Sequence, residues 1–315
     1  MRPGSRSKRR PGMSTVLESL PQGGRVAVVR LRSMGDCILT TPALAILKRT
    51  RPDVSLAIVV EERFAAIFEG NPDVAIKLPP DWSALRSWSP RLCINLHGGP
   101  ASATITALSG AAIRAGFAHF RHSFIYNVKI PRSQEILGTE TKVHTAEHLA
   151  SAMFYLGAPR VEIPKARLFA APSRESHPYA VIHPVASAPD KTWPAERFMD
   201  IANHLERYLE LDPIFIGAVG EDLSSFCRWP TILGAPLCEL KSLIAGASLF
   251  LGNDSGPAHL AAAFGIPAVV IFGASDPVIW APWRTNAEVM VGSQGIGSVS
   301  VRQVTEALER LRVKA

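Results

Sequence analysis

Asp36 is the first residue whose type and position suggest chemistry. It ends the turn Ser33-Met34-Gly35-Asp36, which joins a β-branched apolar run at residues 25–31 to a helical pattern at 38–48. A carboxylate at the start of a helix can act as a general base. Aspartate is also common as a helix cap, where it contributes about 1 kcal/mol of stability. Position alone favours the cap.

A second loop, residues 184–193 (PVASAPDKTW), follows an apolar run and precedes a helical pattern. It contains Ser187 and Lys191, and a lysine beside a hydroxyl can bind phosphate oxygens without a metal. An exposed loop lysine usually has no such role, so this loop by itself is a weak indication.

A third loop, residues 252–259 (GNDSGPAH), joins a strand to a helix. The first backbone N–H groups of such a helix can hold a diphosphate, assisted by the positive end of the helix dipole. Asp254 and Ser255 stand at this junction, and Gly256 allows a ligand to approach closely. His259 is one turn into the helix and could reach the same ligand, although a helical histidine more often serves packing.

Apolar strand-like runs alternate with helical patterns along the whole chain. This alternation predicts an α/β fold whose parallel sheets are covered by helices on both faces. The predicted strands are residues 25–31, 55–60, 74–78, 92–96, 179–185, 213–217, 248–252 and 268–273. The predicted helices are residues 38–48, 63–69, 142–156, 194–209, 239–247, 255–264 and 300–313.

The length of 315 residues suits two domains of about 140 residues each. We predict a basic, disordered tail at residues 1–24, an N-terminal domain at 25–172 and a C-terminal domain at 173–315, with the last helix on either domain. Ligands of doubly wound sheets bind outside the carboxyl ends of the strands. Two such units facing one another would place the site in the cleft between them.

The composition excludes several classes of protein. Hydrophobic residues make up 47% and charged residues 19% of the chain, as in globular proteins with a real core. No apolar run has the length of about 20 residues that a membrane span needs. The four cysteines are far apart in the sequence and no export signal is recognisable, so we expect free thiols and a cytoplasmic protein.

The net charge of +7 is concentrated at the N-terminus. Five positive charges and no acid precede residue 13, in Arg2, Arg6, Lys8, Arg9 and Arg10, and the rest of the chain therefore carries only +2. The nearly neutral body argues against a nucleic-acid-binding protein. A basic arm favours weak attraction to anionic lipid head groups, worth about 1 kcal/mol per charge, although a solvated tail without a role fits equally well.

Taken together, the three loops resemble glycosyltransferase family nine, the ADP-heptose:lipopolysaccharide heptosyltransferases. In the first half the resemblance rests on RVAVVRLRSMGDCILTTPALAILKRTRPDVSLAIVV and the following NPDV. In the second half it rests on HPVASAPDKTWP and on GNDSGPAHLAAAFGIPAVVIFGASDP, which is similar to the family pattern D-[ST]-G-x-x-H-x-A-A-x-x-x-x-P. The resemblance implies a GT-B fold of two Rossmann-like domains facing across a cleft, with an acceptor-binding N-terminal domain and a nucleotide-sugar-binding C-terminal domain.

The resemblance also implies roles for single residues. Asp36 would be the catalytic base, which reverses the preference for a helix cap. The residues implied to bind the donor are Ser187, Lys191, Glu221, Asp254, Ser255, Gly256 and His259, with Glu221 on the nucleotide ribose. The stretch from Glu221 to Glu239 is short for the family, so the nucleotide stays open, and residues 97–124 contain no recognisable acceptor motif.

The activity implied is inverting transfer of a heptose-like sugar from a nucleoside-diphosphate donor, ADP-heptose in this family, to a lipopolysaccharide core or a related envelope saccharide. The implied partners are this donor, a lipid-linked saccharide acceptor and the cytoplasmic face of the inner membrane. We expect no metal and no other cofactor, since no D-x-D motif occurs where a donor would need it. The alternative is a non-catalytic nucleotide-sugar-binding protein of the same fold.

One competing motif points elsewhere, and one further class of enzyme can be weighed on a missing motif. His144-Thr145-Ala146-Glu147-His148 reads H-x-x-E-H, a zinc pattern, but no third ligand is obvious in the sequence. A dinucleotide-dependent dehydrogenase is disfavoured because neither first strand-to-helix turn contains G-x-G-x-x-G.

Overall fold

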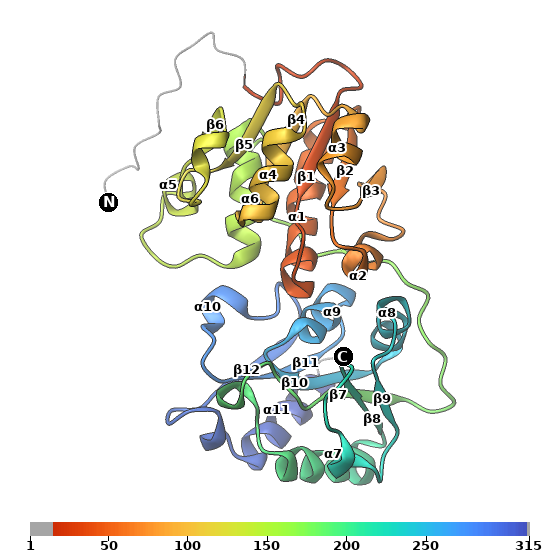
Figure 1. Cartoon of the computed structure of the whole chain (residues 1–315). Coiled ribbons are helices and arrows are strands. Elements are labelled where there is room, and N and C mark those ends of the chain that lie inside the picture. Colours follow the sequence, from red (N-terminus) through yellow and green to blue (C-terminus); the bar gives the residue numbers. More distant parts are fainter. Residues whose placement is uncertain (1–14, 314–315) are drawn as a thin grey trace. The chain divides into compact units, whose positions relative to one another are not determined.

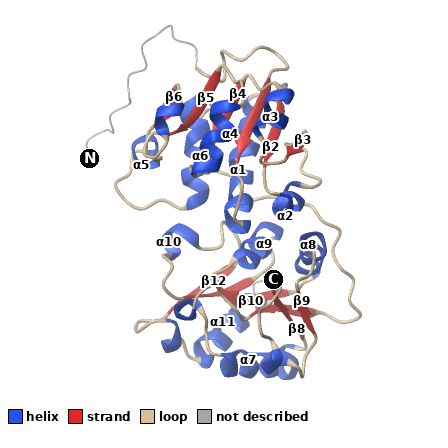
Figure 2. Cartoon of the chain, in the orientation of Figure 1, coloured by secondary structure: helices blue, strands red, loops and turns tan. Residues whose placement is uncertain are grey.

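The computed structural model describes residues 15–313 and contains two six-stranded parallel sheets (Figures 1 and 2). The chain divides into two compact units. The first comprises the described residues up to Arg32, Thr40–Ala65 and Pro72–Pro164, and the second comprises Ser33–Leu39, Ala66–Asn71 and the chain from Lys165 onward.

The first sheet has the strand order β3-β2-β1-β4-β5-β6. Its strands are β1 (Arg25–Val29), β2 (Ser55–Val59), β3 (Ile76–Leu78), β4 (Leu92–Asn95), β5 (Ile113–Phe117) and β6 (Val128–Ile130). The connecting helices are α1 (Met34–Thr50), α2 (Glu62–Ala65), α3 (Trp82–Trp88), α4 (Pro100–Leu108), α5 (Ser133–Leu137) and α6 (Thr145–Leu156), with 3-10 turns at Ala66–Phe68 and Ser123–Ile125. Side chains of α3 and α4 join those of β1, β2 and β4 in one buried cluster.

The second sheet has the order β12-β11-β10-β7-β8-β9, which is the same topology counted from its own first strand. Its strands are β7 (Tyr179–His183), β8 (Asp212–Gly217), β9 (Thr231–Leu233), β10 (Leu249–Asn253), β11 (Ala268–Phe272) and β12 (Ala287–Val291). Its helices are α7 (Ala195–Leu209), α8 (Leu237–Gly246), α9 (Gly256–Phe264), α10 (Pro277–Trp280) and α11 (Val301–Val313), with 3-10 turns at Pro189–Lys191, Ser224–Phe226 and Ile296–Ser298.

Helices cover both faces of the second sheet, with α7 and α11 on one face and α8 and α9 on the other (Figure 2). Buried side chains of α7 and α11 share one core with β7, β8, β10 and β11. The last helix, which the sequence left open between the domains, therefore packs on the second sheet. The predicted α/β fold with two doubly wound sheets is confirmed, since both sheets have the Rossmann strand order.

Residues 15–24 differ from the predicted disordered tail. Leu17 and Leu20 are buried, and the Leu17 amide donates a hydrogen bond of 3.0 Å to the Leu156 carbonyl at the end of α6. The segment is therefore ordered as a packed turn, because two leucines in it have a core to join. The five basic residues of the predicted tail lie within residues 1–14, outside the described residues.

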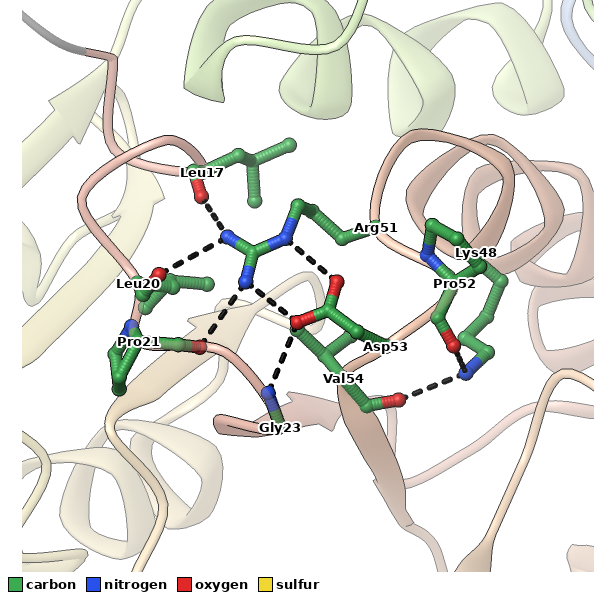
Figure 3. A network of polar contacts seen from close by, with 9 residues as sticks. All are labelled: Leu17, Leu20, Pro21, Gly23, Lys48, Arg51, Pro52, Asp53 and Val54. Atoms are coloured by element: carbon green, nitrogen blue, oxygen red, sulfur yellow. Dashed lines mark hydrogen bonds and ion pairs between the residues drawn. The ribbon is translucent and has the colours of Figure 1, made fainter.

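Arg51 and Asp53 fix this turn (Figure 3). The Arg51 guanidinium makes a bidentate contact with the Asp53 carboxylate, with both N–O distances at 2.8 Å. It also donates to three carbonyls of the turn, those of Leu17, Leu20 and Pro21. The Arg51 contacts, together with the hydrogen bond from the Gly23 amide, hold the pKa of the Asp53 carboxyl well below its usual value.

The described chain has neither a membrane-crossing helix nor a disulfide. No helix formed by residues 15–313 combines the length and the apolar character that a membrane span requires. All four cysteines are free, as predicted: Cys37 and Cys93 are buried, and Cys227 and Cys238 are exposed.

Candidate functional site

The predicted donor-binding residues follow the strands at the carboxyl edge of the second sheet. Strands β7 and β10 are neighbours at the centre of this sheet, and the chain leaves them for opposite sides of it. Such a topological switch point is the usual ligand site of a doubly wound sheet. The structure brings together here the loop after β7, the loop after β8 and the start of α9 after β10.

Asn253, the buried last residue of β10, holds the loop that contains Ser187 and Lys191. Its side-chain oxygen accepts a hydrogen bond of 3.0 Å from the Trp193 amide, and its side-chain nitrogen donates one of 2.8 Å to the Pro184 carbonyl. One amide therefore ties down both ends of the loop. Ser187 is exposed and Lys191 is half-buried on it. The sequence analysis missed this role of Asn253, which the residue's position inside the third motif could have suggested.

Lys191 and Asp254 form the charged part of this edge. Burial raises the pKa of the Asp254 carboxyl, while a hydrogen bond with Ser275 and the positive charge of Lys191 lower it. The net shift is upward, so the desolvation of this half-buried carboxylate outweighs the attraction of its neighbours. A lysine can bind phosphate oxygens, and a nearby carboxylate can accept hydrogen bonds from hydroxyl groups. The pair therefore suits a ligand that contains both, such as a sugar diphosphate.

Gly273, directly after β11, allows the loop that contains Lys191 to lie close to the end of this strand. A Cβ at this position would lie 2.9 Å from Lys191 Cα and closer still to the Asp190 carbonyl oxygen. We expect Gly273→Ala to displace the loop and to weaken nucleoside-diphosphate binding about tenfold or more, because a displaced lysine loses its ideal distance to phosphate. Calorimetric titration with ADP measures the loss. Gly297→Ala is the matched control, since a Cβ there meets nothing within 4 Å, and equal affinities of the two variants would contradict the expectation.

Glu221, after β8, is linked to the same edge through His183. The Glu221 carboxylate accepts a hydrogen bond of 2.7 Å from the Ala218 amide, and its Oε2 lies 3.9 Å from His183 Nε2. On the other side of the ring, His183 Nδ1 lies 2.9 Å from the Ser255 hydroxyl. His183 is thus the residue that joins two predicted donor-binding side chains, and the sequence analysis did not single it out.

The start of α9 provides the remaining predicted residues. Gly256 is the first residue of the helix and Ser255 occupies the N-cap position, in extended backbone conformation. His259 is buried in the first turn of α9, with its ring 6.4 Å from the Trp280 ring, centroid to centroid. Six of the seven predicted donor residues therefore lie in the two loops that flank the switch point and in the first turn of α9, and Glu221 follows the adjacent strand.

Asp36 lies in the first turn of α1, where the chain leaves β1. Its carboxylate accepts a hydrogen bond of 3.0 Å from Ser33 Oγ, and the side chain is half-buried. Strand β1 is the central strand of the first sheet, so Asp36 stands beside the switch point between β1 and β4. The position fits a group that meets a ligand, and its role as a base stays a prediction.

Asn95 ends β4 as Asn253 ends β10. It is fully buried, and its side-chain oxygen accepts hydrogen bonds from the amides of His97 (2.9 Å) and Gly98 (3.1 Å). Its side-chain nitrogen donates to the Ser102 hydroxyl of α4 at 3.1 Å. Both switch points are therefore organised by an asparagine at the end of the corresponding strand.

The histidines of the H-x-x-E-H motif serve the start and the packing of α6. His144 Nδ1 accepts a hydrogen bond of 3.1 Å from the Ala146 amide, while the Glu147 carboxylate accepts one from the His144 amide. The His148 ring stacks on Phe117 at 4.1 Å between centroids and lies 3.1 Å from Ser133 Oγ. Among residues 15–313 no group of three histidine, cysteine or carboxylate side chains is arranged to hold a metal ion.

The chain matches the family model described as glycosyltransferase family 9 (heptosyltransferase) over residues 82–209 and 223–307. It is 27% identical over 292 residues to lipopolysaccharide heptosyltransferase 3 of Escherichia coli K12, covering 81% of this chain and 84% of that protein. It is 21% identical over 303 residues to the lipopolysaccharide core heptosyltransferase OpsX of Haemophilus influenzae, covering 84% and 83%.

Solved structures share the fold. A glycosyl transferase family 9 protein from Veillonella parvula superposes with a TM-score of 0.82 at 21% identity, covering 93% of this chain and 98% of that one. The E. coli heptosyltransferase WaaC with ADP gives a TM-score of 0.76 at 21% identity, covering 91% and 99%. The predicted GT-B fold class is thereby confirmed. Because the family model matches well over half of the chain, this protein belongs to glycosyltransferase family 9, the heptosyltransferases, and is a glycosyltransferase.

Proposed function

We propose that this protein is an inverting, metal-independent heptosyltransferase of lipopolysaccharide synthesis. Its donor is a nucleoside-diphosphate heptose, of which ADP-heptose is the first candidate, and its acceptor is a lipopolysaccharide core or a related lipid-linked saccharide. The observation that carries the proposal is the set of donor-loop residues at the switch point of the second sheet, in a chain whose relatives are named lipopolysaccharide heptosyltransferases. These names give no support to the alternative of a non-catalytic binder.

In the proposed mechanism, Asp36 removes the proton from the acceptor hydroxyl as this hydroxyl attacks the anomeric carbon of the donor. The bond between that carbon and the diphosphate breaks in the same displacement, so the anomeric configuration inverts. Lys191 and the amides of the first turn of α9 balance the charge that develops on the departing diphosphate. Ser187, Asp254, Ser255, Gly256 and His259 bind the donor sugar and diphosphate, and Glu221 binds the ribose.

The proposed acceptor also places the enzyme at a membrane surface. A lipid-linked saccharide lies at the cytoplasmic face of the inner membrane, and we propose peripheral contact there. The first twelve residues support it, because they contain five positive charges and no acid.

A direct assay tests the proposed function. The purified protein is incubated with ADP-heptose and a heptose-deficient core lipid, with and without a metal chelator, and the product is analysed by mass spectrometry and by NMR of the anomeric proton. We expect one heptose to be added per acceptor, with inverted configuration and at an unchanged rate in chelator. Retained configuration or loss of activity in chelator would refute the corresponding part of the proposal.

Donor choice is tested separately by thermal unfolding in the presence of a panel of nucleotide sugars. A ligand at a hundred times its Kd stabilises the folded protein by about 2.7 kcal/mol. If a uridine or guanosine nucleotide sugar stabilises the protein and ADP-heptose does not, the donor contains that nucleotide instead of ADP.

A further inference from the structure

His183 is the last residue of β7 and stands at the switch point of the second sheet with only 8% of its surface exposed. A histidine buried in this way needs polar partners for its ring nitrogens. Ser255 Oγ lies within hydrogen-bond distance of Nδ1, at 2.9 Å, and the Glu221 carboxylate is the charged neighbour of Nε2, with Oε2 3.9 Å away. These two partners follow the two strands that flank β7 in the sheet, β8 and β10.

The partners determine which ring nitrogen carries hydrogen. Burial lowers the pKa of His183 to about 4, against the opposing effect of Glu221. The ring is therefore neutral at neutral pH, and only one of its two nitrogens carries a hydrogen. The Glu221 carboxylate favours this hydrogen on Nε2, and the Ala218 amide fixes the carboxylate in place. Nδ1 then offers a lone pair, and Ser255 donates its hydroxyl hydrogen to it.

This hydrogen bond turns the Ser255 side chain away from its usual partner. Ser255 is the N-cap residue of α9, yet its side chain makes no capping hydrogen bond. By contrast, Asp81 and Asp276 at the N-caps of α3 and α10 accept hydrogen bonds of 2.9 Å from the amides of Ser83 and Val278. A serine is among the preferred capping residues. At α9 the second residue is Pro257, which has no amide hydrogen, so the Ala258 amide is the capping partner left to Ser255, and the bond to His183 competes with that one.

We propose that His183 is a positioning residue of the donor site: by holding the Ser255 hydroxyl, it keeps the first amides of α9 available for the donor diphosphate. The inference rests on the proposed function, in which these amides bind the diphosphate. Without His183, rotation about the Ser255 Cα–Cβ bond lets the hydroxyl cap the helix, and a diphosphate then has to displace it.

Four variants test this role by calorimetric titration with ADP. His183→Ala should raise the Kd for ADP about fivefold, which is the equilibrium equivalent of one helix cap. His183→Asn should bind like the wild type, because its amide lies where Nδ1 lies and can hold Ser255. His183→Gln places its amide near the position of Nε2 and should behave like His183→Ala. Addition of Ser255→Ala to His183→Ala should tighten ADP binding again, whereas Ser255→Ala alone should not tighten it.

A purely structural role for His183 predicts a different pattern. If Asn and Gln variants lose ADP affinity equally, or if Ser255→Ala changes the affinity by the same factor in both backgrounds, the inference is overturned. The Asn and Gln pair decides the question even where His183→Ala fails to fold. A wild-type protein that binds neither ADP nor another nucleoside diphosphate would instead refute the proposed donor site, which separates the two failures.

Discussion

Asp36→Asn should slow sugar transfer about a hundredfold to ten-thousandfold and leave donor affinity nearly unchanged. The amide keeps the shape of the carboxylate and can still accept the hydrogen bond that Ser33 Oγ donates to Asp36. It cannot take up the proton of the acceptor hydroxyl, so the loss falls on the chemical step. Single-turnover rates and calorimetric titration with the donor measure the two quantities separately.

Asp200→Asn is a suitable control, because this exposed aspartate of α7 is part of neither predicted site. Full transfer activity of Asp36→Asn with a competent acceptor would show that Asp36 serves the start of α1 alone. The base would then have to be sought elsewhere around the first sheet, with His97 as the next candidate.

Lys191→Ala should weaken donor binding and also slow turnover, each by about tenfold or more. The lysine charge acts on the diphosphate in the bound donor and more strongly on the departing nucleoside diphosphate, so both quantities depend on it. The Lys191 charge also lowers the pKa of the Asp254 carboxyl, which burial has already raised above its ordinary value, so the loss of the lysine should raise this pKa further. The acidic limb of the pH profile for donor binding should therefore move to higher pH in the variant.

Calorimetric titrations with ADP across the acidic range, together with single-turnover rates, provide the measurement. Lys129→Ala removes an exposed lysine from the first sheet and is the matched control for net charge. A Lys191→Ala enzyme with wild-type donor affinity and an unmoved pH profile would place this lysine outside the donor site.

The sequence predicted the strands at the centre of each sheet and the edge strand β3, and it missed β5, β6, β9 and β12. The central strands β1, β7, β10 and β11 are buried apolar runs, because helices cover both faces of a parallel sheet. β5 contains Arg114, which hydrogen bonds to the Ile125 and Ala111 carbonyls, and Gly116, where a Cβ would collide with the Tyr126 ring. β6 and β9 have three residues each, as the predicted β3 does, and strands this short give only a weak periodic signal.

The motif residues of the candidate site were recognisable in the sequence, but the residues that hold them were not. The bond between His183 and Ser255 joins positions 72 apart, and those of Asn253 to Trp193 and Pro184 join positions 60 and 69 apart. Such partners become visible only when the register of β7 against β10 is known. The zinc pattern is a motif that was recognisable in the sequence but has another role in the structure. His144 caps the start of α6, and His148 follows one turn later in the same helix.

The asparagines that end β4 and β10 hold their loops with a group that does not titrate. A side-chain amide offers one acceptor and two donors at every physiological pH, and both Asn95 and Asn253 use the two kinds of partner at once. An aspartate would supply only acceptors and would change its charge with acidity. The hydrogen bonds that hold the two loops therefore stay the same when the pH changes. Changes of activity with pH are expected to come from the titratable side chains at the switch points instead.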